Sequence, residues 1–310
     1  MNPPPPAPPR RTLATPAVVQ GIGLFTEHPA TCTIAPADAG TGVRFCRTDL
    51  PGSPTVPATI ASLADRPVHP AFASIPPRHT AVASSQHPDA IVYTTEHLLA
   101  ALLGMGVTDA TIEINTNELP IGDGSALLFT DAITAAGLRD VANTTPADTI
   151  APLTLDAPIT VTSPDRRASI TAEPLGPHDT PSYRYQLDYG PAAPIPPQHA
   201  EWCSDTSDFL DRIAPARTFS LAAEAQQMQA LGLFRSFTPR DLLVIDDTGA
   251  PINNTWRSEA EPARHKLLDL IGDLALVGRP LHARVVATHA GHALNHAMAR
   301  ALVAAGHAEP

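Results

Sequence analysis

Residues 264–274 read Arg-His-Lys-Leu-Leu-Asp-Leu-Ile-Gly-Asp-Leu, and this stretch is the most informative part of the chain. As a helix it is apolar over most of its circumference, so we expect it in an interior. His265, Asp269 and Asp273 lie four residues apart and share one stripe of that helix. A buried carboxylate needs a partner because its desolvation is costly, and a metal ion is one such partner. Gly272 predicts close packing against another backbone, since glycine in mid-helix costs roughly 1 kcal/mol relative to alanine.

Glu96 and His97 offer the complementary chemistry in the first turn of a second apolar helix. The helix dipole there favours a negative charge, so the glutamate can stay ionised while the imidazole acts as a ligand. A catalytic zinc site typically has three protein ligands and an open position for water, with a nearby carboxylate that takes the water's proton. His97, His265 and Asp269 with Glu96 satisfy that count.

Each of these residues also has a plainer interpretation. Asp269 alone would be an ion-pair partner of Arg264 or of another cation, and His265 a hydrogen-bonded core histidine. Glu96 near an N-cap is commonly a helix-capping carboxylate. The combination, and no single residue, therefore indicates the metal site.

Other histidines compete for the same role. His292 and His296 are also four residues apart, and His282 and His289 are close to them in the sequence. Spacing alone leaves these sets open. For His289 and His296 we predict a surface or N-cap role.

Composition limits the class of protein. The 310 residues suffice for two domains, and 43% apolar with 16% charged residues is typical of a folded globular chain. A net charge of −11 argues against binding to nucleic acid or anionic lipid, although an anionic small molecule remains possible at a local cluster. The chain has three cysteines, an odd number at wide spacing, which predicts no disulfide framework and a reducing cytosol: Cys32, Cys46 and Cys203.

Membrane and export signals are not expected. The longest apolar runs end well before the ~18 residues that a membrane span needs. The first ten residues are mostly proline, without the apolar region of a secretory signal. We therefore expect a cytoplasmic protein without a transmembrane segment.

Alternation and helical periodicity predict the same order of elements twice. In the first half we expect strands at 31–34, 42–45, 90–93 and 111–114, and helices at 96–103, with Thr94 or Thr95 as N-cap, and 125–136. In the second half we expect strands at 159–161, 168–172 and 183–189, and helices at 221–231, 261–277 and 292–305. The fold class is therefore α+β, with two similar domains, each a β-sheet layered against helices; the duplication rests on element order alone.

The domain organisation follows from composition. Residues 1–11 are expected to be a mobile Pro-rich tail, 12–145 an N-terminal α+β domain and 146–310 a C-terminal α+β domain. The boundary is placed in the polar stretch near 142–149. A cleft between the two halves is the expected ligand site.

Four groups of segments together resemble the UDP-3-O-acyl-N-acetylglucosamine deacetylase family of lipid A biosynthesis. They are Gly21-Ile22-Gly23-Leu24 with Arg47-Thr48-Asp49-Leu50; Thr95-Glu96-His97-Leu98; Glu118-Leu119-Pro120-Ile121 with Asp123-Gly124-Ser125-Ala126; and a C-terminal block of Ala216-Arg217-Thr218-Phe219, Arg264-His265-Lys266 with Leu268-Asp269, Ile271-Gly272-Asp273-Leu274 and Gly291-His292-Ala293-Leu294-Asn295. Their order and spacing extend from about residue 12 to residue 304.

The resemblance implies an active site at the domain interface and a reaction. Zn²⁺, or Fe²⁺ in its place, would bind His97, His265 and Asp269, and Glu96 would activate the metal-bound water to attack the acetamide carbonyl. Thr218 and Lys266 would stabilise the oxyanion, and His292, oriented by Asp273, would protonate the leaving amine. The products would be UDP-3-O-acyl-glucosamine and acetate, the committed step of lipid A biosynthesis, catalysed by a monomer.

The resemblance also implies a passage for the 3-O-acyl chain in an insert at about 220–250. The apolar candidates for its lining are Phe219, Met228, Leu231, Phe234 and Phe237, which ordinary core packing would explain equally well. Beside the Gly-x-Gly-Leu turn the family usually has a histidine and, two positions later, a glycine, where this chain has Phe25 and Glu27. Where the family usually has Gly-Gly-Ser in the insert, this chain has Ser236-Phe237-Thr238.

These departures keep two alternatives open. One is a zinc deacetylase of the same fold that acts on a different acylated amino sugar. The other is an inactive metal-binding homologue that serves as a partner. Retention of Glu96, Thr218, Lys266 and His292 argues against the inactive homologue.

Overall fold

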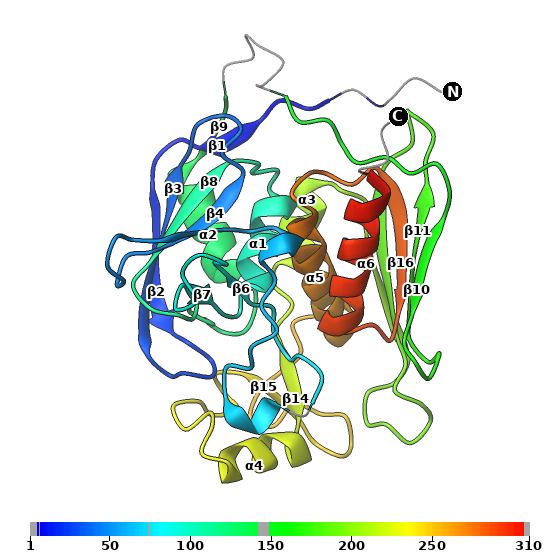
Figure 1. The fold of residues 1–310 in the computed structure, drawn as a ribbon. Coiled ribbons are helices and arrows are strands. Elements are labelled where there is room, and N and C mark those ends of the chain that lie inside the picture. The colour runs from blue at the N-terminus through cyan, green and yellow to red at the C-terminus, as the bar shows by residue number, and fades with distance from the viewer. Residues whose placement is uncertain (1–4, 6, 74, 142–148, 307–310) are drawn as a thin grey trace.

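Two five-stranded sheets form the outer layers of the molecule, and the main helices lie between them (Figure 1). The structure is a computed structural model that describes residues 5, 7–73, 75–141 and 149–306. It agrees with the α+β fold class and with two similar sheet-and-helix units. No helix among these described residues is long and apolar enough to cross a membrane.

The two sheets have the same topology. The first has the order β2 (Ala17–Ile22), β3 (Pro29–Pro36), β8 (Ala110–Ile114), β4 (Val43–Arg47) and β5 (Thr55–Pro57). The second has the order β10 (Ile159–Thr162), β11 (Ser169–Pro174), β16 (Ala283–Thr288), β12 (Ser182–Leu187) and β13 (Gln198–Trp202). In each, the central strand is the last in the chain, pairs in parallel with the fourth strand and is antiparallel to the second. The duplication predicted from element order is therefore confirmed.

Equivalent helices flank the central strand in each half. Helix α1 (Glu96–Gly104) precedes β8 and α2 (Leu127–Ala136) follows it, while α5 (Glu261–Leu274) precedes β16 and α6 (His292–Gly306) follows it. Helices α1 and α5 pack against each other at the centre of the molecule. This places the two sequence segments that carry the metal-ligand candidates side by side.

Gly272 is the point of closest approach between these two helices. A Cβ atom built there would lie 2.0 Å from the carbonyl oxygen of Glu96, so no side chain fits. The predicted close packing of Gly272 against another backbone is confirmed. The helix stops as expected, because a 3₁₀ turn (Ala275–Val277) leads into Gly278, which adopts φ +81°.

Strand β16 escaped the sequence prediction, although it is the central strand of the second sheet. Its alternation is clear, since Ala283, Val285 and Ala287 are buried while the residues between them are not. Pro280 and Gly291 bracket the strand in the sequence and are the signal that would have found it.

The smaller elements close the structure. Two short pairs join β1 (Arg11–Leu13) to β9 (Leu138–Asp140) and β6 (Val82–Ala83) to β7 (Ile91–Val92). A projection at the lower end in Figure 1, which we call the insert, comprises residues 219–245 with β14 (Phe219–Leu221), α4 (Ala222–Ala230) and β15 (Leu243–Ile245). The remaining elements are a one-turn helix α3 (Thr206–Asp208), the π-helical segment Phe209–Ile213 that continues it, and 3₁₀ turns at Ile60–Ser62 and Pro70–Phe72.

The predicted domain limits fall partly outside the described residues. Residues 142–148, which contain the expected boundary, and residues 1–4 and 6 of the expected tail are among those not described. Arg11, the last residue assigned to that tail, lies in β1. The three cysteines are free, as the sequence predicts.

Candidate metal and catalytic centre

Three buried side chains converge where the start of α1 meets the middle of α5. His97 Nε2 lies 3.6 Å from Asp269 Oδ1, and His265 Nε2 lies 3.3 Å from the same oxygen. The donor atoms of all three residues lie within 4.8 Å of one another. Two imidazoles and one carboxylate are a ligand set that divalent zinc accepts. The residues predicted to bind a metal are therefore brought together.

The orientation of His265 suits a ligand. Its Nδ1 lies 3.1 Å from the carbonyl oxygen of Ala216, so Nδ1–H donates to that carbonyl and Nε2 keeps its lone pair. Burial lowers the pKa of His265 to about 3, which keeps the ring neutral. A neutral imidazole with a fixed tautomer is the form that binds metal ions.

Asp269 divides its two oxygens between two functions. Oδ1 faces the two histidines, while Oδ2 accepts a hydrogen bond from Lys266 Nζ at 2.8 Å. Burial opposes ionisation of Asp269, but His265 and Lys266 outweigh it and hold the pKa of Asp269 well below its usual range. The expected pairing of Asp269 with a cation is therefore present, but the partner is Lys266 and not Arg264.

Glu96 lies beside the metal candidates at the first position of α1. It is buried, and its Oε2 accepts a hydrogen bond from the backbone N–H of Thr80 at 3.0 Å. Burial raises the pKa of Glu96 above its usual value. Thr95 is the N-cap residue of α1, one of the two that the sequence predicts, but its hydroxyl makes no capping bond and donates to the carbonyl oxygen of Thr80 instead.

Asp273 and His292 form a second charged pair one helical turn further along α5. His292 Nδ1 lies 2.8 Å from Asp273 Oδ2, which also accepts from Asn295 Nδ2 at 2.8 Å. Burial lowers the pKa of His292, but Asp273 outweighs that effect and raises the pKa to about 9. His292 is thus cationic at neutral pH, and it shares a pocket with Glu96.

His296 contradicts its sequence interpretation. It was expected on the surface or at an N-cap, but it is 4% exposed and its Nε2 lies 2.7 Å from Thr80 Oγ1. The reason is that α6 packs on α5 and turns both His292 and His296 inward. His289 is half-buried, and its backbone N–H donates to the carbonyl oxygen of Gln186.

Thr218 reaches the same pocket from the start of the insert. Its backbone N–H donates to the carbonyl oxygen of Gly124 at 2.7 Å, and a Cβ on Gly124 would lie 2.7 Å from Thr218 Cγ2. Gly124 adopts φ +83°, a conformation that glycine takes without strain. The Asp123-Gly124-Ser125-Ala126 segment therefore positions Thr218 against the centre.

Glu118 is a site residue whose role sequence reasoning missed. It is fully buried and accepts hydrogen bonds from the backbone N–H groups of Phe25 and Thr26 and from the hydroxyls of Thr26 and Thr94. Thr94 adopts φ +59°, which is strained for a β-branched residue. Glu118 therefore fixes the turn that delivers Glu96 and the loop that carries Phe25.

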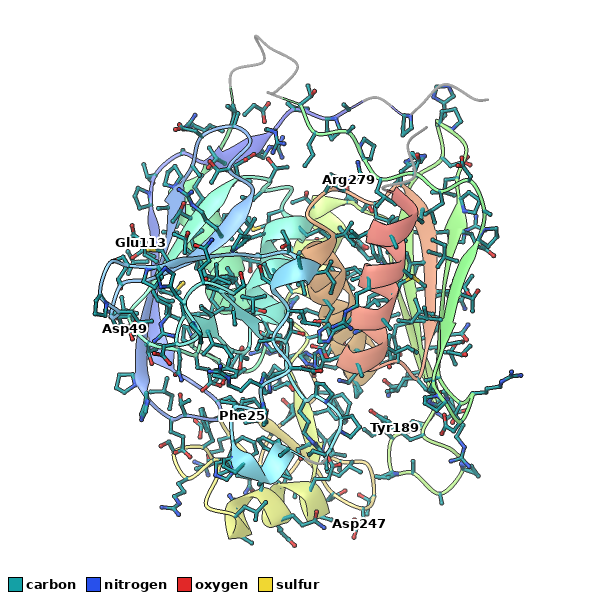
Figure 2. The ribbon with its side chains drawn as sticks, viewed as in Figure 1. Phe25, Asp49, Glu113, Tyr189, Asp247 and Arg279 are labelled. Carbon is teal, nitrogen blue, oxygen red and sulfur yellow. The ribbon has the colours of Figure 1, made fainter. Side chains whose placement is uncertain are left out.

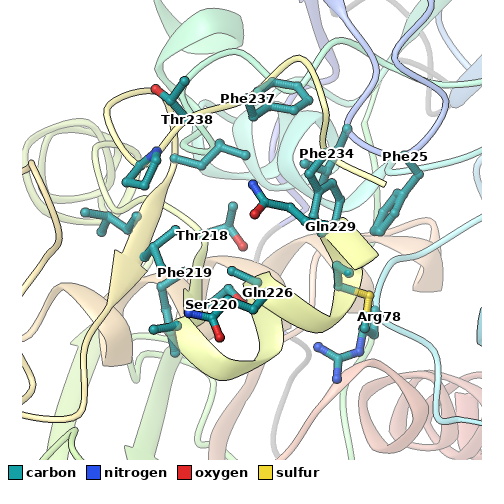
Figure 3. A pocket seen from close by; sticks show the side chains of 18 of the residues that line it. Phe25, Arg78, Thr218, Phe219, Ser220, Gln226, Gln229, Phe234, Phe237 and Thr238 are labelled. Carbon is teal, nitrogen blue, oxygen red and sulfur yellow. The ribbon is translucent and has the colours of Figure 1, made fainter. Parts of the chain in front are cut away.

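A cavity of about 430 Å³ adjoins the centre and extends into the insert (Figure 3). Four of the predicted passage residues line it: Phe219, Met228, Phe234 and Phe237. Leu231 does not; it is 52% exposed, because it follows the last turn of α4 and turns away from the cavity. Thr218, Lys266 and His292 line both this cavity and the small pocket over the metal candidates, so the two spaces are continuous.

Phe25 and Glu27, which depart from the usual pattern beside the Gly-x-Gly-Leu turn, both contact the insert. Phe25 packs against Phe72 and Phe234, with ring centroids 5.4 and 5.7 Å away, and lies where the first half meets the insert (Figures 2 and 3). Glu27 accepts hydrogen bonds from the backbone N–H groups of Arg235 and Ser236, at 2.8 and 2.7 Å. Both residues therefore attach the insert to the first half, and Phe25 also lines the cavity.

The centre as a whole combines three kinds of group in one buried pocket. It has a ligand set for a divalent metal, a carboxylate able to accept a proton and an imidazolium able to donate one. Such a combination hydrolyses a carbonyl compound by metal-assisted attack of water. The apolar cavity beside it fits a substrate with an aliphatic portion.

Comparison with known proteins agrees with this geometry. Residues 10–304 match the family model described as LpxC, UDP-3-O-acyl N-acetylglycosamine deacetylase. Proteins named UDP-3-O-acyl-N-acetylglucosamine deacetylase are similar over nearly the whole chain. The one from Synechocystis sp. is 35% identical over 93% of this chain and 96% of its own length, and the one from Thermosynechococcus vestitus is 36% identical over 94% and 93%. The one from Chlamydia caviae is 33% identical over 95% and 96%.

Proposed function

We propose roles for the residues of this centre on the premise that the chain belongs to the LpxC family of UDP-3-O-acyl-N-acetylglucosamine deacetylases. It is a metal-dependent amidohydrolase that removes the N-acetyl group of UDP-3-O-acyl-N-acetylglucosamine, the committed step of lipid A biosynthesis. The assignment of each step to a side chain is our proposal.

Zinc would be held by His97, His265 and Asp269. Support comes from their burial, from the convergence of one donor atom each, and from the Ala216 carbonyl that fixes the tautomer of His265. When bound, the ion supplies a Lewis acid that polarises the acetamide carbonyl and lowers the pKa of its water toward ~7. Lys266, bonded to the second oxygen of Asp269, keeps that carboxylate ionised.

Glu96 is the general base. It lines the small pocket with the three ligands, and the Thr80 backbone N–H holds one of its oxygens at 3.0 Å. Within the described part of the chain, no group donates a hydrogen bond to its other oxygen, Oε1. That oxygen can therefore accept the proton of the attacking water. Its raised pKa brings it closer to the operating pH, which favours proton transfer.

His292 is the general acid. Asp273 accepts from Nδ1, so Nε2 carries the proton that goes to the leaving amine. The raised pKa of about 9 keeps the ring protonated through the neutral range. Asp273 therefore acts by orienting and charging His292.

Thr218 and Lys266 stabilise the negative charge that develops on the carbonyl oxygen. Both line the small pocket, one with a hydroxyl and one with an ammonium group. Burial opposes the charge on Lys266, but Asp269 outweighs it and raises the pKa of Lys266 above its usual value. The ammonium group is thus present at any working pH.

The 3-O-acyl chain enters the 430 Å³ cavity between Phe219, Met228, Phe234 and Phe237. Its apolar lining and its continuity with the small pocket support this path. Phe25 narrows the end near Phe72, so we propose that it limits the length of the chain that fits. We further propose a cytoplasmic monomer, since its substrate carries a water-soluble nucleotide.

The convergence of Glu96, the three ligands and His292 in one buried pocket is the observation that carries these roles. The test is acetate release from UDP-3-O-acyl-N-acetylglucosamine, with metal analysis, for wild type and Glu96→Gln. The amide keeps the shape and the Thr80 contact but cannot accept the proton, so kcat should fall by about 10²–10⁴ with zinc retained. Near-normal turnover of Glu96→Gln, or its failure to retain zinc, would contradict the base role.

A further inference from the structure

Thr80 lies between the proposed base and the proposed acid, outside the residues assigned to the reaction. It is fully buried in the loop that precedes β6. Its backbone N–H donates to Glu96 Oε2 at 3.0 Å, and its carbonyl oxygen accepts from Thr95 N at 3.1 Å. The main chain of Thr80 is therefore fixed against the first turn of α1.

The side chain of Thr80 reaches the opposite half of the molecule. Its hydroxyl donates to Asp273 Oδ1 on α5, and His296 Nε2 on α6 lies 2.7 Å from the same hydroxyl oxygen. A hydroxyl can donate one hydrogen bond, and here it donates that bond to Asp273. The hydroxyl oxygen of Thr80 therefore accepts a hydrogen bond from His296 Nε2–H. This arrangement fixes the ring nitrogen of His296 that carries a proton.

Asp273 is consequently held from both sides. Thr80 occupies Oδ1, while His292 Nδ1 and Asn295 Nδ2 contact Oδ2, each at 2.8 Å. Without the hydroxyl, Oδ1 would lose its direct donor inside the protein, since His296 Nε2 is 3.7 Å away. A buried carboxylate that loses a hydrogen-bond donor turns toward the donors that remain. The imidazole ring of His292, which is hydrogen-bonded to Asp273, would move with it.

The same contacts argue against a second metal in this place. Asp273, His292 and His296 have donor atoms within 4.8 Å of one another, as a metal site requires. The Thr80 hydroxyl oxygen already contacts all three, since it donates to Asp273 Oδ1 and lies 2.7 Å from His296 Nε2 and 3.5 Å from His292 Nδ1, so it occupies the space between their donor atoms. The group is therefore a hydrogen-bond network.

We infer that Thr80, supported by His296, is a positioning residue that sets the geometry of His292 relative to Glu96. The inference rests on the proposed acid role of His292. The backbone bond to Glu96 does not depend on the side chain, so removing the hydroxyl disturbs the acid and leaves the base in place. Binding of the acylated sugar nucleotide does not involve Thr80, which lines neither the cavity nor the small pocket.

The test compares Thr80→Val and Thr80→Ser in the zinc-loaded full-length enzyme, by steady-state acetate release. Valine keeps the shape, and serine keeps the hydroxyl. We expect kcat of Thr80→Val to fall about 10- to 100-fold, as for a misplaced catalytic group, with KM and zinc content unchanged. Thr80→Ser should recover most of the loss. The matched control is Thr130→Val, another buried threonine, whose hydroxyl bonds, among the residues that the structure describes, only to the Leu127 carbonyl in α2.

A double-mutant comparison separates this inference from the role of His292 itself. In a His292→Ala background, Thr80→Val should have no further effect, because both act through one group. An equal loss in both backgrounds, a rise in KM alone, or wild-type kcat for Thr80→Val would overturn the positioning role. Wild-type activity of His292→Ala would instead refute the acid assignment. If Thr80→Val does not fold, the same comparison is made with His296→Phe in the wild-type and His292→Ala backgrounds. An unchanged kcat of His296→Phe in the wild-type background overturns the inference.

Discussion

Replacing Gly272 by alanine should separate the two halves of the active site. The added Cβ would lie 2.0 Å from the carbonyl oxygen of Glu96, 2.8 Å from its carbonyl carbon and 3.0 Å from its Cα. All three are backbone atoms and cannot rotate away. Because real Cβ contacts stay above 3.0 Å, α1 and α5 must move apart by at least 1 Å at this point.

Two opposing effects set the change in the free energy of unfolding, and the displacement of the helices sets the change in kcat/KM. Alanine improves helix propensity by roughly 1 kcal/mol, while overpacking in a dense interior costs about 1–3 kcal/mol. The free energy of unfolding should therefore fall by no more than about 2 kcal/mol. A shift of ~1 Å between Glu96 and the ligands on α5 should lower kcat/KM by about 100-fold.

The assays are urea unfolding, zinc content and acetate release. Gly291→Ala serves as the stability control, because no heavy atom of the described residues, apart from its two chain neighbours, lies within 4 Å of a Cβ built at Gly291. A Gly272→Ala enzyme that is folded and has wild-type kcat/KM would refute the argument that this contact sets the spacing of the site.

Four further outcomes follow from the same structure. His292 has a pKa raised to about 9 by Asp273, so kcat/KM should fall as pH rises through about 9, and Asp273→Asn should move that limb to lower pH; a limb that stays in place would contradict the assignment. For the same reason the stabilisation from this pair is fully present below pH ~6.5 and is lost as pH rises through about 9, which unfolding curves across that range can detect. Arg217→Met leaves the buried Glu261 carboxylate without its bidentate partner and should lower the free energy of unfolding by about 3–5 kcal/mol; a change under ~1 kcal/mol in urea unfolding would show that the pair is dispensable. Removal of zinc by a chelator should lower the Tm of wild type more than that of His265→Ala, measured by thermal unfolding with and without added zinc.

The sequence determined the class and the chemistry because both depend on local patterns. The apolar helix with His265, Asp269 and Asp273 on one stripe predicted a buried helix with candidate metal ligands, and Gly272 predicted a close backbone contact. Element order predicted the duplication, because strands are followed by helices in each half, although the strand between α5 and α6 was missed. The segments that resemble the deacetylase family, present in both halves, then narrowed the expected reaction to hydrolysis of an acetamide.

Only the tertiary structure decided which residues complete the site. Thr80 and Glu118 are far in sequence from the groups that they hold, and their types carry no signal of their own; packing of two halves brings Thr80 to Asp273. The same packing buries His296, for which a surface or N-cap role was predicted, and leaves Leu231 exposed. A stripe of residues on one helix is written into the sequence by its period, whereas a contact between two helices depends on how closely they approach, and here a single glycine permits that approach.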